Sequence, residues 1–272
     1  MSPDVSRYAD LDRPPLSEDA LRAALIRPGA LWSAVHVVQQ TGSTNSDLLD
    51  AAAEHADGTV LIAEEQSAGR GRLDRRWVSP ARAGLTCSLL IRPRSDRDRW
   101  GWLPLLTGVA VAAAVSRLGE VRAVLKWPND VLLGGGKVAG ILLQSSGDAV
   151  VIGFGLNVST RPSELPGGGA SLASVQAACV DRDPLLRAIL REFAGWYDRF
   201  EDADGDAEAC GLRDAYRRLC DTLDRTVRVA VPSGVDLLGT AVDIAADGGL
   251  VVATSGGVHT VAAGDVTHVR PV

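Results

Sequence analysis

Residues 126 to 142 have the sequence KWPNDVLLGGGKVAGIL, in which two short apolar runs flank three glycines at 134–136. Glycine adopts positive φ angles without strain, so a glycine cluster between two such runs is typical of a hairpin turn. We therefore predict strands over 121–127, 131–133 and 137–144, with a polar turn at the Pro-Asn-Asp step.

Helical and extended patterns follow one another on both sides of this hairpin. Helices are expected over 18–26, 47–54, 103–118 and 184–200. Further strands are expected over 32–40, 59–63, 85–91 and 149–158. A mixed order of this kind predicts an α/β domain built on a mixed sheet, and we expect its helices to pack on one side of that sheet.

The pattern changes near residue 222, where helices give way to short strands. These strands are expected at 226–231, 237–244, 250–253 and 258–262, with the turn sequence ADGG at 246–249. Short strands separated by turn residues predict a small β-barrel. We divide the chain into a tail with a short helix at 1–31, a main domain at 32–221 and a barrel at 222–272.

The composition is that of an ordinary globular chain, with 46% hydrophobic and 23% charged residues. Acidic side chains outnumber basic ones by 34 to 28, and the resulting net charge of −6 disfavours broad binding to nucleic acid. The four cysteines have no C-x-x-C spacing and the four histidines are dispersed, so we expect neither a zinc site nor a disulfide framework. We therefore expect reduced thiols and a cytoplasmic location.

One segment is apolar enough to raise the question of a membrane. The run from 100 to 116 carries no charge, but its 17 residues fall short of the about 20 that a spanning helix needs. Pro104 and Gly108 also interrupt it. We expect a buried helix here and no membrane segment, and the polar N-terminus lacks the apolar core of a secretory signal.

The segment GRGRLDRRW at 69–77 is the strongest local signal. Its four arginines and one aspartate give a local charge of +3 in an acidic chain. Glycines let backbone N–H groups approach an anion, and guanidinium groups bind phosphate or carboxylate with two hydrogen bonds. Trp77 offers an aromatic face for a purine. Together, the glycines, the arginines and the tryptophan favour a nucleotide site, and a mobile basic surface loop remains the alternative. The segment lacks the third glycine of the dinucleotide-binding fingerprint G-x-G-x-x-G, so we do not expect a Rossmann-type site.

Two lysines and two polar turn residues form the second signal. Lys126 and Lys137 lie at the ends of neighbouring predicted strands, where both can approach one polyanion. Asn129 and Asp130 add an amide and a carboxylate that is able to bind metal. The GGGKV sequence is not a P-loop, because Val138 follows the lysine where Ser or Thr is needed. A strand followed by a simple turn is the alternative.

The third signal is the sequence GFGLN, within the strand predicted over 149–158. Gly153 and Gly155 indicate that a ligand or another backbone approaches this strand closely, although packing alone also explains them. Asn157 is a single amide in an apolar strand and is able to contact an adenine edge. No Ser/His/Asp or Cys/His set is present, which favours direct attack by a substrate group on a nucleotide phosphate.

These three motifs, in this order and spacing, resemble those of the biotin protein ligases, which form biotinyl-5′-adenylate from biotin and ATP and transfer biotin to a carrier lysine. The resemblance covers about residues 32 to 272. It implies a class II synthetase-like catalytic domain followed by a small SH3-like barrel. Asp74 stands where loops of the family commonly carry glycine.

The resemblance also implies the roles of individual residues. Biotin would be bound by Ser43, Thr44, Gln66, Gly69, Arg70, Arg72, Lys137, Gly140 and Gly153. The nucleotide would be bound by Arg72, Arg75, Trp77, Lys126, Asn129, Gly155 and Asn157. Lys137 and Arg72 would be the catalytic residues. Mg²⁺ would arrive with ATP, and we predict no metal site made by protein side chains.

The implied partner is the biotin carboxyl carrier domain of an acyl-CoA carboxylase, and the chain would be a monomer or a ligand-dependent homodimer. Family members that repress transcription add an N-terminal winged helix-turn-helix, whereas only 31 residues precede the catalytic region here, so we expect no DNA binding. Two alternatives remain open. One is lipoate or octanoyl transfer on a related fold, and the other is a biotin-sensing repressor with little turnover.

Overall fold

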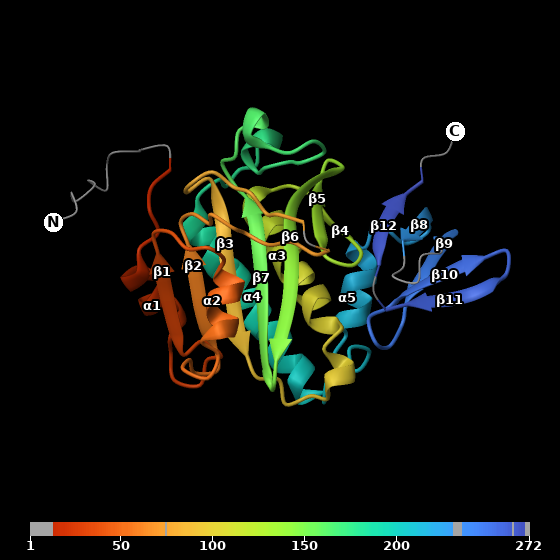
Figure 1. The fold of residues 1–272 in the computed structure, drawn as a ribbon, viewed down its shortest axis with the longest axis horizontal. Helices are drawn as coiled ribbons and strands as arrows, with labels where there is room; N and C mark the ends of the chain where they lie inside the picture. Colours follow the sequence, from red (N-terminus) through yellow and green to blue (C-terminus); the bar gives the residue numbers. More distant parts are fainter. Residues whose placement is uncertain (1–12, 74, 231–235, 263, 270–272) are drawn as a thin grey trace.

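The computed structural model describes residues 13–73, 75–230, 236–262 and 264–269. The main domain is built on a seven-stranded sheet in the order β1-β2-β3-β7-β6-β5-β4 (Figure 1). Its strands are β1 (Ala34–Val38), β2 (Thr59–Ala63), β3 (Gly84–Ile91), β4 (Ala123–Lys126), β5 (Asp130–Leu133), β6 (Gly136–Ser146) and β7 (Ala149–Asn157). Only β1 and β2 pair in parallel, so the predicted mixed sheet is confirmed.

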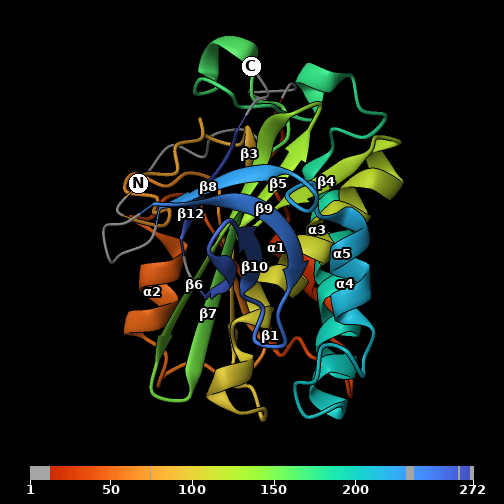
Figure 2. The same ribbon diagram turned by 90° about the vertical axis from the view of Figure 1, so that its right-hand side faces the viewer.

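Helices cover both faces of this sheet (Figure 2). Four of them share one face: α1 (Glu18–Leu25), α3 (Trp102–Gly119), α4 (Arg182–Asp202) and α5 (Leu212–Leu219). The expectation that the helices pack on one side is right for these four and wrong for α2 (Thr44–Asp50), which lies on the opposite face. The physical reason is that β3 and β7 are apolar on both faces. Leu90 and Val151 pack against α2, while Leu89 and Ile152 point to the other helices.

The helix α3 is the apolar segment that raised the question of a membrane. By length and composition it is the one helix among the described residues that is able to span a bilayer, and 72% of it is buried inside the protein. It lies between the sheet and α4, as a core helix does. The predicted helix limits were accurate here, whereas α5 was missed because its eight residues are rich in charge.

The C-terminal region forms a five-stranded antiparallel sheet in the order β11-β10-β9-β8-β12, as predicted for the SH3-like barrel. Its strands are β8 (Thr226–Ala230), β9 (Leu237–Ile244), β10 (Leu250–Thr254), β11 (Gly257–Val261) and β12 (Asp265–His268). In Figure 1 this barrel lies beside α5 and the β4 edge of the main sheet. Its buried side chains belong to the same hydrophobic cluster as the core of the main domain.

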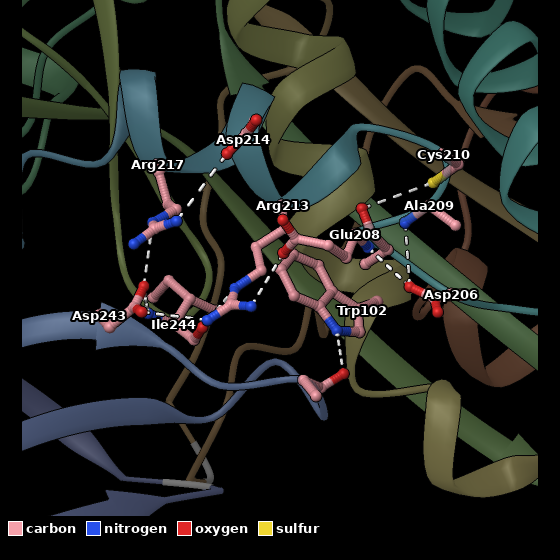
Figure 3. A network of polar contacts seen from close by, with 12 residues as sticks. Trp102, Asp206, Glu208, Ala209, Cys210, Arg213, Asp214, Arg217, Asp243 and Ile244 are labelled. Atoms are coloured by element: carbon pink, nitrogen blue, oxygen red, sulfur yellow. Dashed lines mark hydrogen bonds and ion pairs between the residues drawn. The ribbon is translucent and has the colours of Figure 1, made fainter.

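Polar contacts fix the barrel to the main domain (Figure 3). The indole N–H groups of Trp102 and Trp127 both donate to the turn between β9 and β10, at 2.7 Å to the carbonyl of Ala246 and 3.0 Å to that of Gly248. Arg213 of α5 donates to the Ile244 carbonyl at 2.8 Å and pairs with a carboxylate of β9 at 3.0 Å. Because both indoles are buried, these contacts hold the two units in one arrangement.

A buried ion pair joins the N-terminal segment to the sheet. The guanidinium of Arg182, at the start of α4, lies 2.5 Å from the carboxylate of Glu64, and the two side chains are 5% and 2% exposed. Glu64 also accepts the backbone N–H of Leu16 at 2.6 Å, and Arg182 donates to the Pro14 carbonyl. Residues 13–16, expected to be part of a loose tail, are therefore fixed against the end of β2.

Replacing Arg182 tests this pair. We expect Arg182→Met to lower the free energy of unfolding by about 3–5 kcal/mol, because Glu64 then stays buried without its counter-charge. Adding Glu64→Gln is expected to recover part of the loss. Urea denaturation followed by circular dichroism measures both values. Arg117→Met is the control, since it breaks a more exposed pair with Glu192 and is expected to cost at most about 1 kcal/mol. Equal losses in the two single variants would contradict the buried pair's role.

Candidate active site

The candidate site is a cavity on the α2 face of the sheet. Its walls come from the start of α2, the segment 69–77, the turn 126–130 with β6 and β7, and the barrel strand β12. Thirteen of the predicted site residues line it: Ser43, Thr44, Gln66, Arg70, Arg72, Arg75, Trp77, Lys126, Asn129, Lys137, Gly140, Gly153 and Gly155. Gly69 and Asn157 do not line it. Residues far apart in the chain thus converge on one cavity.

One end of the cavity is uncharged and rich in hydrogen-bonding groups. The backbone N–H and the hydroxyl of Thr44 both donate to the side-chain oxygen of Gln66, at 2.8 and 3.0 Å. Asn45 and Ser88 lie next to Thr44, and the Ser88 hydroxyl is 2.6 Å from the Asn45 oxygen. Neither residue was among the predicted site residues. This end presents fixed donors and acceptors and no formal charge.

The glycines of β6 and β7 make room for side chains from other elements. A Cβ atom on Gly153 would lie 2.0 Å from the Asn45 oxygen, and one on Gly155 would lie 2.2 Å from the Trp77 ring. A Cβ atom on Gly140 would lie 3.0 Å from the end of the Lys137 side chain. Contacts as short as those at Gly153 and Gly155 exclude a methyl group unless Asn45 or Trp77 moves, whereas at Gly140 the flexible end of Lys137 is able to shift.

The other end of the cavity is strongly charged. The ammonium group of Lys137 lies 2.6 Å from the carboxylate of Asp130 and 5.8 Å from the centroid of the Trp77 ring. Lys126 and the arginines of the segment 69–77 also line the cavity. Asp130 is the one carboxylate among the lining residues that the structure describes. The charged end therefore has an excess of positive charge and is able to bind anions.

The arginine-rich segment folds back on itself. The backbone N–H of Trp77 donates to the Gly69 carbonyl at 3.0 Å, and that of Gly71 donates to the Arg75 carbonyl at 2.6 Å. A Cβ atom on Gly69 would lie 2.4 Å from the Trp77 carbonyl oxygen, so glycine is required there for the close approach. Gly69 thus brings Trp77 into the cavity without lining it. Asp74 lies outside the described residues.

The two asparagines differ from each other. Asn129 lines the cavity, and its side chain donates to the Ile141 carbonyl at 3.0 Å, which ties the turn to β6. Asn157 is 5% exposed and donates to the Ala170 carbonyl at 3.0 Å, away from the cavity. The backbone N–H of Ala170 in turn donates to the Lys137 carbonyl at 2.8 Å. The side chain of Asn157 therefore supports the backbone beside Lys137, whereas a direct contact with the nucleotide was expected.

Cys87 is also a lining residue of the cavity, but its side chain lies in the hydrophobic core with Leu85 and Leu89. Cys87 of β3 is 1% exposed, and burial raises the pKa of its thiol, so it stays protonated and is a poor nucleophile. Across the part of the chain that the structure describes, no three His, Cys, Asp or Glu side chains form a group that could hold a metal ion. The chemistry that this chain offers is therefore the positioning and electrostatic stabilisation of bound groups.

Comparison with known proteins gives two family matches. Residues 36–157 match the biotin/lipoate A/B protein ligase family, and residues 222–269 match the biotin protein ligase C-terminal domain. The solved structure of the biotin protein ligase from Aquifex aeolicus in complex with biotin and ATP is 26% identical, with a TM-score of 0.77. That match covers 88% of this chain and 100% of the other.

Curated relatives support the same assignment. The bifunctional ligase/repressor BirA of Escherichia coli is 36% identical over 61% of this chain and 54% of its own length. The biotin–[acetyl-CoA-carboxylase] ligase of Mycobacterium tuberculosis is 43% identical over 95% of this chain and 97% of its own length. A cavity with one neutral polar end and one cationic end, together with these matches, shows that the chain belongs to the biotin protein ligase family.

Proposed function

We propose that this protein activates biotin with ATP to form biotinyl-5′-AMP and pyrophosphate, and then transfers biotin to a lysine of the biotin carboxyl carrier domain of an acyl-CoA carboxylase. The observation that carries the proposal is the division of one cavity into a neutral polar end and a cationic end. Biotin has the matching division, with a cyclic urea at one end and a carboxylate at the other. The carboxylate of biotin would then lie at the cationic end, which also attracts the phosphates of ATP.

The neutral end suits the urea group. Thr44 and Gln66 are joined by two hydrogen bonds, so both side chains are held in position before a ligand arrives. Ser43 is buried beside them and adds a third polar group. A dithiolane or an alkyl chain would leave these buried groups without partners. Biotin is therefore favoured over lipoate and octanoate.

The cationic end brings two anions together. A carboxylate oxygen of biotin attacks the α-phosphorus of ATP and forms the mixed anhydride. The bond between the α-phosphorus and the oxygen that bridges to the β-phosphate breaks, and pyrophosphate leaves. Lys137, Arg70, Arg72 and Arg75 offset the repulsion between the substrates and stabilise the charge on the phosphoryl oxygens. Gly69 and Arg72 belong to the segment that encloses the carboxylate, and Lys126 lies where it is able to reach the triphosphate.

The second step needs a group that removes a proton. The acceptor lysine attacks the acyl carbon of the adenylate as a neutral amine, an amide bond forms, AMP leaves, and the nitrogen loses a proton. Asp130, as the carboxylate that lines the cavity, is the group we assign to accept that proton. Asp130 lies 2.6 Å from the Lys137 ammonium group and its side chain is 20% exposed, which supports this assignment.

The surrounding assignments are also proposals. Mg²⁺ enters with ATP and offsets part of its charge, and we propose no site for it made by protein side chains. Residues 32–221 act as the catalytic domain and residues 222–272 as the barrel. The four free cysteines suit a cytoplasmic location. We propose a monomer or a ligand-dependent homodimer that does not bind DNA.

Exchange of pyrophosphate into ATP tests the function directly. We expect exchange that depends on biotin, followed by labelling of a carrier domain when that domain is added. The control reactions replace biotin with lipoate or octanoate and are expected to show exchange at least about 10²-fold slower, because the polar end is then left without partners. Exchange driven by lipoate and not by biotin would overturn the proposal.

Removing Lys137 separates binding from chemistry. Lys137→Ala is expected to slow adenylate formation by about 10²–10³-fold while the Kd for biotin changes by less than about fivefold, because the ammonium acts mainly on charge that develops at phosphorus. Single-turnover kinetics and calorimetry measure the two quantities. Arg122→Ala, which removes an exposed charge outside the cavity, is the control. A wild-type adenylation rate in Lys137→Ala would exclude the catalytic role.

Adding a methyl group on the floor of the cavity tests the position of Trp77. Gly155→Ala is expected to displace the indole, since the new Cβ would lie 2.2 Å from it, and to slow adenylation by about 10²-fold. Gly195→Ala in α4 is the matched control, because a Cβ there meets no atom within 4 Å. Similar rates for the two variants would mean that the indole is not needed where the structure has it.

A further inference from the structure

Ser88 lies directly beneath the polar end of the cavity without lining it. The residue sits in the middle of β3, is 0% exposed, and interrupts the apolar strand GLTCSLLI. Its hydroxyl lies 2.7 Å from the Thr44 hydroxyl oxygen and 2.6 Å from the Asn45 side-chain oxygen. A fully buried hydroxyl in contact with two other polar side chains indicates a specific arrangement of hydrogens.

The donors and acceptors around Ser88 determine that arrangement. Both N–H groups of the Asn45 amide are used, at 3.2 Å to the Leu142 carbonyl and 3.1 Å to the Gln144 side-chain oxygen. The oxygen of Asn45 is therefore left to accept, and the Ser88 hydroxyl is the donor that faces it. This fixes Asn45 in the space that Gly153 leaves open.

The same reasoning fixes Thr44 and Gln66. The backbone N–H of Thr44 donates to the Gln66 oxygen, so the amide of Gln66 has one orientation, with its oxygen toward α2 and its NH₂ group toward Gly69. The Thr44 hydroxyl donates its single hydrogen to that oxygen, so the one hydrogen of Ser88 is shared between the oxygens of Thr44 and Asn45. Thr44 therefore presents a lone pair to the cavity, and Gln66 presents N–H donors.

We propose that Ser88 is a positioning residue that determines specificity for the head group of the acid substrate. Together with Asn45 it holds Thr44 as an acceptor and Gln66 as a donor, and this pair matches a ligand in which an N–H group stands beside a carbonyl, as in a cyclic urea. The inference rests on the proposed function, because it assigns the origin of selectivity at the same cavity. Ser88 touches no substrate atom and acts through Thr44 and Asn45.

Calorimetry of biotin binding to the wild-type protein comes first, and its failure would reject the proposed function and not the role of Ser88. Ser88→Ala is then expected to raise the KM for biotin about tenfold or more and to leave the KM for ATP within about twofold. The KM for dethiobiotin, which keeps the urea group, is expected to rise by the same factor in Ser88→Ala. The ratio of kcat/KM for biotin to that for lipoate is expected to fall about tenfold.

Two further variants keep the test decisive. Thr107→Val removes an equally buried hydroxyl that donates within α3 at 2.8 Å, far from the cavity, and is expected to change neither KM. Ser88→Cys retains a weak donor in a similar volume and is expected to give an intermediate KM for biotin, even if Ser88→Ala does not fold. An unchanged KM for biotin, or equal rises in the KM for biotin and ATP, would overturn the proposal.

Discussion

The site depends on the buried strand β7, where two glycines leave space that other elements fill. Gly153 accommodates Asn45 from α2, and Gly155 accommodates Trp77 from the arginine-rich segment. The same strand is apolar on its other face, where it packs against the long helices. One strand thus supports a dense core on one side and a binding cavity on the other. A side chain of any size at either glycine would remove one wall of the cavity.

Electrostatics is local in this protein. The chain is acidic overall, with a formal net charge of −6, yet the described residues that line the cavity include two lysines, several arginines and one carboxylate. The ion pair between Lys137 and Asp130 keeps that carboxylate from lying unpaired beside anionic substrates. Net charge therefore says little about the ligands of a cavity, because screening limits its influence to about 8–10 Å.

The sequence was sufficient to predict most elements and the convergence of three motifs. Runs of apolar residues located β2 and β9 to the residue, because each has a clear pattern and clear turns at its ends. The sequence pattern could not show that α2 lies on the opposite face of the sheet from the other helices, because that depends on tertiary packing. Ser88 carried a usable signal, because it and Thr86 are the polar side chains of an otherwise apolar strand, but only Asn157 was predicted from a signal of this kind. The direction of the Asn157 side chain follows from the loop at Ala170, which no local pattern reveals.

The two buried indoles that reach the barrel give that small unit a mechanical part in the site. Trp127 is held from both sides, since its backbone N–H donates to Thr222 at 3.0 Å and its ring N–H donates to Gly248 at 3.0 Å. Asn129 and Asp130 follow it directly along the chain. The barrel therefore fixes the position of Trp127 and, with it, the turn that lines the cavity at residues 128–130.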